Sequence, residues 1–329
     1  MYPVSEAYKT AIRARTRTDR VTGTLTLTDG TVLPLTAAEL MSGSLTLDNQ
    51  CVTGEELAFG CAYLGQAALN LRTDLSRHAF YGAKLVLHYG LQLPGGRWET
   101  VPLGVYTVAE AERRALYVSI KAYDNILALQ QKYDGTTMQG TAYALLGQIA
   151  AACGLTLGQT EAEIGALNPN AALVCQLSGA DGLSTWRECA AAVAQLVGGF
   201  AAADRAGRLV IRPFAAAACA ALGPGDRSEA GISDLRCHYA ALSIETADGR
   251  YAAGNEQDSG LTMTITEMPL AEKGLPEIRA QIAEHLFAIL QKLDYTPATV
   301  TMPGDPAFEP GDRIALQTLS GATPTGEER

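Results

Sequence analysis

The sequence predicts an α+β protein that is mainly β, and two patterns support this prediction. Residues 20–125 hold about six short segments that alternate apolar and polar residues and are separated by turn signals, a spacing typical of a β-barrel or sandwich. Residues 135–215 change to helical spacing of the apolar residues, which indicates a small α+β unit. Alternating segments then return around one long helix.

The chain opens with an amphipathic segment. Tyr8, Ala11 and Ile12 share one apolar face with basic side chains opposite, so residues 1–19 are predicted to form a basic N-terminal helix. The cations of this segment and the next residue are Lys9, Arg13, Arg15, Arg17 and Arg20. With two acidic residues subtracted, residues 1–20 carry +3, which leaves -13 for the rest of a chain whose total is -10. These five cations are candidate contacts for an acidic neighbour; the alternative is a solvated helix face.

A β-hairpin is predicted next, from Thr22 to Leu35. Asp29-Gly30 is a two-residue turn signal between its alternating segments. Pro34 has no amide hydrogen to give to a ladder, so its strand is expected at a sheet edge. Two further strands are predicted over 42–48 and 84–93.

The most regular pattern runs from Trp98 to Tyr133. It predicts a strand, a charged turn over 109–115, a second strand and a helix. The inward residues are expected to be Val101, Leu103, Val105 and Thr107 in the first strand and Leu116, Val118, Ile120 and Ala122 in the second. Asp124 can then accept from the free amides at the start of the helix, whose apolar stripe ends at Tyr133.

Two capped helices are predicted in the middle of the chain. Thr141 can cap the first helix, and Thr185 with Glu188 has the spacing of a capping box for the second. The helices are expected over 142–153 and 185–196, a loop over 158–170 and a hairpin over 200–214.

The C-terminal part repeats strand patterns around the long helix. Strands are expected over 238–246, 261–267, 298–301 and 313–317, and the helix over 276–293. A sheet that ends on the last strand leaves one edge unpaired. We therefore expect either that the natural sequence continues beyond Arg329, or that a partner covers this edge.

Composition excludes several classes of protein. A net charge of -10 disfavours a general nucleic-acid surface, because phosphate binding needs a basic face. The longest apolar runs are shorter than a membrane span, and no signal peptide is visible, so a soluble protein without membrane insertion is expected. Seven cysteines without any C-x-x-C motif indicate folding in a reducing cytoplasm rather than a disulfide framework or a zinc site.

Motifs for chemistry are scarce. His285 follows Glu284, but Ile289 stands where a zinc-binding helix needs its second histidine, so His285 is predicted to be a packed residue. The segment 223–228 matches a phosphate loop over three residues only and lacks its lysine. We therefore predict no catalytic, cofactor-binding or metal-binding residue, no cofactor, and a protein that is not an enzyme.

Several quoted segments resemble the tail-hub (baseplate hub) proteins of bacteriophages and the N-terminal portion of tail-associated lysins from phages of Gram-positive bacteria. The segments are V-P-L-G-V-Y-T-V at 101–108, V-S-I-K-A-Y-D at 118–124, L-T-L-D-N-Q-C-V at 45–52 with E-E-L-A-F-G at 55–60, and E-P-G-D-R-I at 309–314. The likeness is spread over most of the chain and has no single fixed signature.

The resemblance implies a structural virion protein. Hubs of this kind are trimers with two β-barrel-like domains per chain, and the ring joins the tail tube to a central spike or fibre. The implied organisation is a first barrel-like domain at 20–134, a small α+β domain at 135–222 and a second barrel-like domain at 223–329. Its implied partners are itself, as a homotrimer, and other tail proteins such as the distal tail or tube protein and the spike or fibre. Its implied location is the virion tail.

Two alternatives remain open at the level of sequence. A peptidoglycan hydrolase would need two placed carboxylates, and Asp124, Glu245 and Asp312 are candidates whose pairing the sequence does not reveal. A cell-wall glycan-binding module would need an aromatic platform; Trp98 and Trp186 could supply one, although Trp186 stands at a helix start and is expected in the core.

Overall fold

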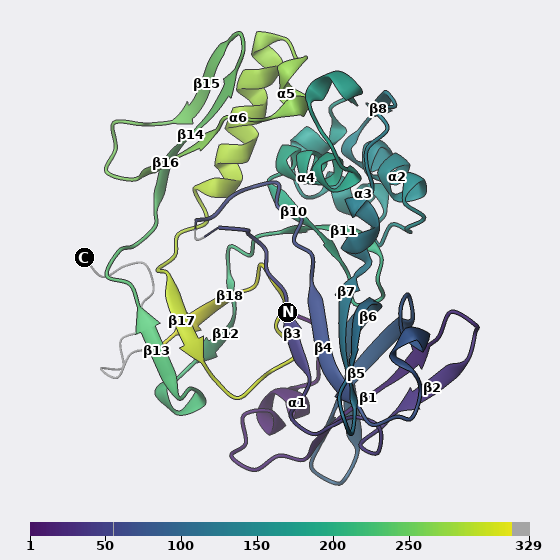
Figure 1. Cartoon of the computed structure of the whole chain (residues 1–329). Coiled ribbons are helices and arrows are strands. Elements are labelled where there is room, and N and C mark those ends of the chain that lie inside the picture. Colours follow the sequence, from purple (N-terminus) through teal and green to yellow (C-terminus); the bar gives the residue numbers. More distant parts are fainter. Residues whose placement is uncertain (55, 318–329) are drawn as a thin grey trace.

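The computed structural model describes residues 1–54 and 56–317, so the last part of the predicted 223–329 domain lies outside the described residues. The molecule is mainly β, with one large antiparallel sheet at one end and a mixed α/β part at the other (Figure 1). The mainly β, α+β fold class is confirmed. None of the described helices combines the length and apolarity that a membrane crossing requires.

The large sheet is formed by the first seven strands in the order β2-β1-β5-β6-β7-β4-β3. Their bounds are β1 (Asp19–Thr26), β2 (Val32–Leu35), β3 (Thr46–Asp48), β4 (Gln66–Leu71), β5 (Lys84–Gln92), β6 (Trp98–Arg113) and β7 (Val118–Asp124). Alternate residues of β4, β5 and β7 are buried on one face, as the period-2 pattern predicts. Pro34 lies in β2 at the sheet edge, which confirms that prediction.

A β-bulge in β6 corrects the predicted inward face of this strand. The pairing of β5 with β6 shifts between Leu87 and His88, so Leu103 is the extra residue on β6. A bulge reverses the side-chain alternation beyond it. Tyr106 and Val108 are consequently buried in the sheet core, whereas Val105 and Thr107 face the other side. Of the four residues predicted to face inward from this strand, only Val101, before the bulge, is fully buried. In the second strand, Val118, Ile120 and Ala122 are buried as predicted.

Two predicted boundaries in this part are wrong. The polar turn expected over 109–115 belongs mostly to β6, which continues to Arg113 because its charged side chains face solvent while Ala111 stays buried. The turn itself is Arg114–Tyr117, and Leu116 at its tip is 83% exposed instead of facing inward. The N-terminal helix α1 (Glu6–Ala11) is much shorter than residues 1–19, since β1 already begins at Asp19.

The barrel predicted for 20–134 is not confirmed. The strand order begins at β2 and ends at β3, and no ladder joins these two edges among the described residues. Closure is limited to a single bridge, in which Leu40, after β2, faces Leu71 at the end of β4. The sheet core is shared by side chains of β1, β2, β4, β5, β6 and β7, so the sheet curves around a core without closing.

The mixed part contains most of the helices. Its first elements are the 3₁₀ helix η2 (Asn125–Gln130), β8 (Met138–Gly140), α2 (Ala142–Ala152), α3 (Glu161–Gly165), η3 (Pro169–Ala172), β9 (Cys175–Leu177), η4 (Gly179–Asp181), α4 (Trp186–Leu196), β10 (Gly199–Ala203) and β11 (Leu209–Pro213). Thr141 caps α2, and Thr185 with Glu188 forms the capping box of α4, as predicted. The predicted loop at 158–170 is wrong, because Thr160 and Glu163 form a further capping box that begins α3.

The remaining elements belong to the C-terminal part. They are β12 (Ala218–Leu222), η5 (Pro224–Asp226), β13 (Glu229–Ile232), β14 (Tyr239–Thr246), β15 (Gly249–Gly254), β16 (Leu261–Ile265), α5 (Pro269–Glu272), α6 (Pro276–Leu290), β17 (Ala298–Thr301) and β18 (Arg313–Leu316). The described strands form small sheets, β15-β14-β16, β13-β17 and β12-β18. A second barrel is therefore not confirmed in the described part of 223–329.

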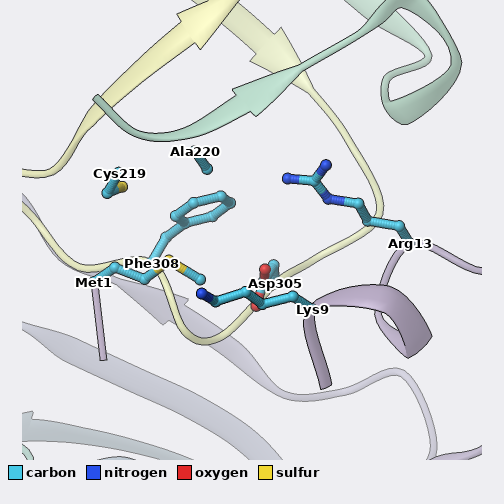
Figure 2. Close-up of a pocket in the computed structure, with 7 residues that line it drawn as sticks. All are labelled: Met1, Lys9, Arg13, Cys219, Ala220, Asp305 and Phe308. Atoms are coloured by element: carbon cyan, nitrogen blue, oxygen red, sulfur yellow. The ribbon is translucent and has the colours of Figure 1, made fainter. Parts of the chain in front are cut away.

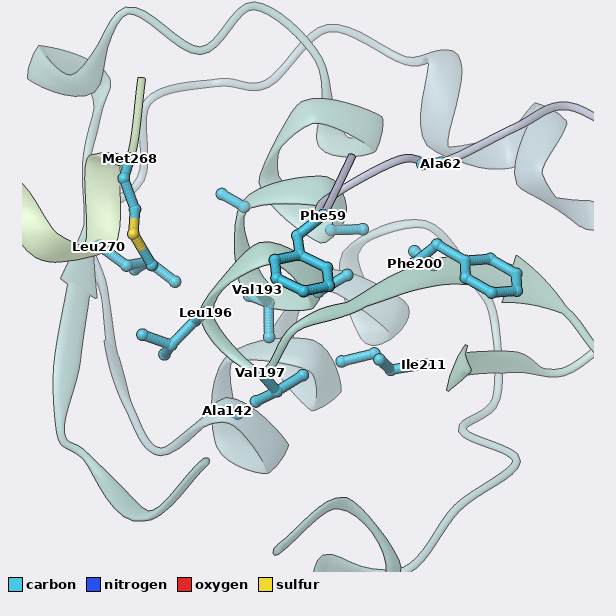
Figure 3. Close-up of a cluster of buried hydrophobic side chains, with 14 of the residues drawn as sticks. Phe59, Ala62, Ala142, Val193, Leu196, Val197, Phe200, Ile211, Met268 and Leu270 are labelled. Carbon is cyan, nitrogen blue, oxygen red and sulfur yellow. The ribbon is translucent and has the colours of Figure 1, made fainter. Parts of the chain in front are cut away.

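One large core crosses the predicted boundaries. It joins Phe59, α2, α4, β10, β11, β14, β16, α5 and α6 in one cluster of buried side chains, and Figure 3 shows Phe59, Phe200 and Met268 around α4. The loop before β4 runs beside β10, where the Ala201 amide donates to the Cys61 carbonyl at 2.8 Å. In addition, β12 pairs with β18 across the predicted boundary at residue 222.

One buried asparagine, Asn170, joins two helices of this core. Asn170 is fully buried, and its side-chain amide donates to the Leu196 carbonyl at 3.1 Å and the Ile282 carbonyl at 3.3 Å. Its oxygen lies 2.7 Å from Nδ1 of His285. Because α4 and α6 both bond to this one side chain, the segment 168–170, which separates helical stretches in the sequence, also sets how the two helices pack together. His285 is a packed residue, as predicted.

Candidate interaction surfaces

The candidate carboxylates each have partners of their own. Asp124 is buried, and its two oxygens accept from the amides of Ile126 at 3.0 Å and Gly65 at 3.1 Å. Burial raises the pKa of Asp124 to about 7, against the opposing effect of these two hydrogen bonds. Asp312 binds the N-terminal amine and the Glu309 amide, while Glu245 is exposed on β14. The structure does not bring these three carboxylates together as a catalytic pair.

The other candidate chemical motifs serve the fold. In the segment 223–228, the Asp226 carboxylate accepts from the Gly223 amide at 2.8 Å, so an anionic side chain occupies the place of a phosphate. Trp186 is 7% exposed and packs edge-on against Tyr133, with ring centroids 4.9 Å apart. Within residues 1–54 and 56–317, no group of three or more His, Cys, Asp or Glu side chains is arranged to hold a metal ion.

The Trp98 ring is covered on one face. The guanidinium of Arg20 lies 4.0 Å from the ring centroid, a cation–π arrangement. A sugar that stacked on this face would have to displace Arg20. The geometry therefore does not favour the glycan platform considered from the sequence.

The five predicted interface cations lie near one another in sequence but have different surroundings. Lys9 pairs with Glu6 at 2.6 Å, Arg17 donates to the Ile12 carbonyl at 3.0 Å, and Arg20 stacks on Trp98. Arg13 and Arg15 are exposed and make no hydrogen bond or ion pair with any described residue. These two side chains are the ones most available to a partner; that all five contact one stays a prediction.

Two hollows flank this basic segment. Lys9 and Arg13 extend toward a small pocket of about 60 Å³ whose other lining residues include Cys219, Asp305 and Phe308 (Figure 2). A wider groove of about 440 Å³ lies between residues drawn from 10–18 and residues drawn from 92–96, at the turn between β5 and β6. The groove is open and lined by threonines, alanines and Arg17, which suits a protein surface rather than an enclosed small ligand.

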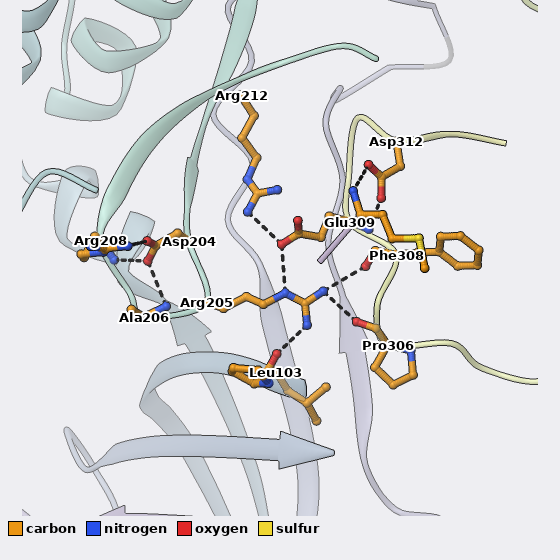
Figure 4. Close-up of polar contacts among 12 residues, drawn as sticks. Leu103, Asp204, Arg205, Ala206, Arg208, Arg212, Pro306, Phe308, Glu309 and Asp312 are labelled. Carbon is orange, nitrogen blue, oxygen red and sulfur yellow. Dashed lines mark hydrogen bonds and ion pairs between the residues drawn. The ribbon is translucent and has the colours of Figure 1, made fainter. Parts of the chain in front are cut away.

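A cluster of ion pairs connects the large sheet to the C-terminal part (Figure 4). Glu309 accepts from Arg205 and Arg212, each at 2.9 Å. Arg205 also donates to the carbonyls of Pro102 at 2.5 Å and Pro306 at 2.7 Å. Burial alone would raise the pKa of Glu309, but the hydrogen bonds and charges of the two arginines hold it at about 2. The three side chains come from β10–β11 and from the segment before β18.

Sequence reasoning missed this cluster. Arg205 stands in the predicted turn of the 200–214 hairpin, and Glu309 stands in a quoted segment, but they are 104 residues apart. The available signal was charged residues in short turns beside Gly and Pro. Such residues are usually solvated, so the signal does not distinguish a buried pair from an exposed one.

Several strand edges and apolar side chains are open to solvent. All four residues of β13 and all three of β3 are exposed, and each strand has a neighbour on one side only among the described strands. Leu116 and Leu235 are 83% and 75% exposed. Unprotected edges and exposed apolar side chains are typical of surfaces that other chains cover.

The comparisons with known proteins concern the fold. No protein-family model and no curated protein matches the sequence. Among solved structures, the 43 kDa tail protein of prophage MuSo2 from Shewanella oneidensis matches with a TM-score of 0.51 at 12% identity, covering 93% of this chain and 89% of that chain.

Two further solved structures show weaker likeness. A chain of the native gene transfer agent virion has a TM-score of 0.27 at 18% identity, with 40% of this chain and 49% of that chain covered. A chain of the Francisella PdpA-VgrG complex has a TM-score of 0.39 at 8% identity, with 75% and 40% covered. The likeness to the prophage protein extends over nearly the whole chain, and in its fold this chain is similar to a prophage tail protein.

Proposed function

We propose that this chain is a structural protein of a phage or prophage tail, and that it acts as a hub at the tail tip. The observation that carries the proposal is the fold likeness to the MuSo2 tail protein, because it covers most of both chains. The segments quoted from the sequence point independently to the same class of protein.

The finer role is a trimeric ring that joins the tail tube to a central spike or fibre. The exposed strands β3 and β13 and the exposed leucines support it, since a ring protomer needs surfaces for its neighbours. Its partners would be two further copies, a distal tail or tube protein, and the spike or fibre. Its location would be the virion tail.

A tail-assembly experiment tests this role. Deleting the coding sequence from the phage or prophage should leave tails without a completed tip, and supplying the chain in trans should restore them. Electron microscopy of the purified tails should show three copies of the chain in a ring at the tip. Normal tails assembled without the chain would contradict the proposal.

We also propose that the chain has no catalytic role. The support is that Asp124, Glu245 and Asp312 do not meet and that Trp98 is covered by Arg20. Zymography on peptidoglycan should show no clearing. Lytic activity that disappears when one aspartate or glutamate is replaced would overturn this part.

A further inference from the structure

Opposite ends of the molecule carry opposite charge. The segment with α1 and residues 12–18 lies at one end of the molecule, and β14–β16 with α6 lie at the other (Figure 1). Residues 1–20 carry a net charge of +3. Residues 239–290 hold eight acidic and three basic residues, a net charge of -5.

The basic end offers cations that the fold does not use. Arg13 and Arg15 are exposed and make no hydrogen bond or ion pair with any described residue. They belong to the segment that forms one wall of the 440 Å³ groove, where Arg17 is a lining residue. Arg17 is the cation that lines the groove itself, whereas Arg13 lines the smaller pocket and Arg15 lines neither. A surface element of another chain that enters the groove therefore meets Arg17 directly and lies beside a segment of positive charge.

The acidic end offers unpaired carboxylates on an accessible helix face. Glu277 and Glu284 are exposed on α6, seven residues apart and therefore on one side of the helix. Glu245 and Glu267 are also exposed. Within the described part of the chain none of the four makes a salt bridge, although Glu245 lies opposite Arg250 in the β14–β15 ladder. By contrast, the Asp248 and Glu256 carboxylates nearby are already paired, with Arg279 and Arg250.

A closed ring of identical chains needs two different faces that fit each other, because each copy presents one face forward and the other backward. We propose that the groove at the basic end binds the carboxylate face of α6 of a second copy, so that copies join basic end to acidic end. This inference rests on the proposed ring and specifies its interface. Charge complementarity of this kind selects the partner and the orientation and accelerates the encounter.

Charge reversal at each end tests the interface with the full chain. Three variants would be compared with the native chain. The first double variant carries Arg13→Glu and Arg15→Glu, the second carries Glu277→Lys and Glu284→Lys, and the fourfold variant carries all four substitutions. Sedimentation velocity at low and high salt would give the trimer dissociation constant. Each double variant should raise it by about tenfold or more, and the native trimer should weaken in high salt, because salt screens exposed charges.

The fourfold variant is the decisive arm. Its two faces have exchanged charge, so its trimer should return to nearly native stability, although both double variants are weakened. Mixing the two double variants is a poorer test, because a ring of three cannot alternate two kinds of chain. Arg77→Glu with Lys132→Glu is the matched control: both side chains are exposed, away from the groove, and the change in net charge equals that of the first variant. It should leave the dissociation constant unchanged.

The outcomes separate this inference from the proposed function. A native chain that is monomeric at high concentration, with no ring in tail micrographs, overturns both. A trimer that none of the reversals weakens overturns only the charge-matched interface. Reversals that leave the trimer intact but detach the chain from tails assign the groove to another tail protein and also overturn it. Melting curves of the monomeric variants, expected to match one another, exclude loss of folding as the cause of dissociation.

Discussion

At the scale of single residues, Asp124 shows how much one side chain can do at a junction. Its carboxylate accepts a hydrogen bond from the Gly65 amide at the end of β7, and it caps η2 by accepting another from the Ile126 amide. The sequence predicted the cap but not the second bond, and the helix that it predicted up to Tyr133 is a 3₁₀ helix that ends at Gln130.

Replacing Asp124 by Ala should lower the free energy of unfolding by about 1–2 kcal/mol, because one helix cap and one buried amide lose their acceptor. Chemical denaturation of both proteins measures this difference. Asp134→Ala is the control: that carboxylate also accepts from a backbone amide, of Thr136 at 2.9 Å, but it is exposed and should cost less. An unchanged denaturation midpoint for Asp124→Ala would contradict the capping role.

The raised pKa of Asp124 predicts a pH dependence of folding. The pKa of Asp124 rises from 3.8 to about 7 on folding. Its contribution to stability is therefore fully present below pH 3.8 and is lost as the pH rises through about 7. Asp124→Asn removes this titration. The stability of the native protein relative to the variant should therefore decline between pH 4 and pH 7.5, and a difference that stays constant over this range would refute it.

At the scale of elements, α4 and α6 depend on a residue that belongs to neither. Asn170 bonds the carbonyls of Leu196 and Ile282 and also contacts His285. The sequence placed this asparagine in a loop, because Asn-Pro-Asn is a turn signal. Local pattern identifies the turn, but it does not identify the helices that the turn fastens.

Asn170→Ala should therefore destabilise the protein by about 2–3 kcal/mol, since the fully buried side chain leaves its polar partners unsatisfied. Urea unfolding followed by circular dichroism measures the change. Gln257→Ala, at an exposed amide, serves as the control and should change stability by less than about 0.5 kcal/mol. Equal effects of the two substitutions would argue against the fastening role.

The bulge in β6 makes a second prediction at this scale. Gly104 has φ of +137°, and a Cβ added there would lie 2.9 Å from the Tyr106 hydroxyl. Gly104→Ala should destabilise the sheet by about 1–3 kcal/mol through backbone strain and this contact. The melting temperature should fall, because two ring carbons of Tyr106 lie nearly as close to the added Cβ, at 3.0 Å, as its hydroxyl does. No fall in melting temperature would show that the bulge tolerates a side chain.

At the scale of the whole molecule, the Arg205–Glu309–Arg212 cluster joins parts that are distant in sequence. It is supported by Tyr2, whose amide donates to the Ala307 carbonyl at 2.7 Å and whose ring lies 4.8 Å from the Arg205 guanidinium. These contacts hold together the N-terminus, the β10–β11 hairpin and the segment before β18. They thereby fix the large sheet relative to the C-terminal part.

Glu309→Gln should lower the free energy of unfolding by about 2 kcal/mol. This is below the range for a fully buried ion pair, because the carboxylate keeps some contact with solvent. The pKa of Glu309 is lowered from 4.5 to about 2, so its contribution is present above the ordinary value and is lost as pH falls toward 2. The stability difference from the variant should be constant from pH 5 to pH 8 and shrink below pH 4.5. This pH dependence runs in the opposite direction to that of Asp124, and a shared direction would contradict one of the two assignments.

The sequence by itself determined the local structure. Alternation identified most strands of the first sheet, and the caps at Thr141, Thr185 and Asp124 lie where short-range side-chain chemistry places them. These features depend on residues a few positions apart, so pattern is sufficient to predict them.

Only the tertiary structure decided the arrangement of these elements. It left the first sheet open, paired β12 with β18, merged the predicted middle and C-terminal units into one core, and brought Glu309 to Arg205. The physical reason is that strand pairing and ion pairing between distant segments depend on how the whole chain buries its apolar surface. No short window of sequence carries that information.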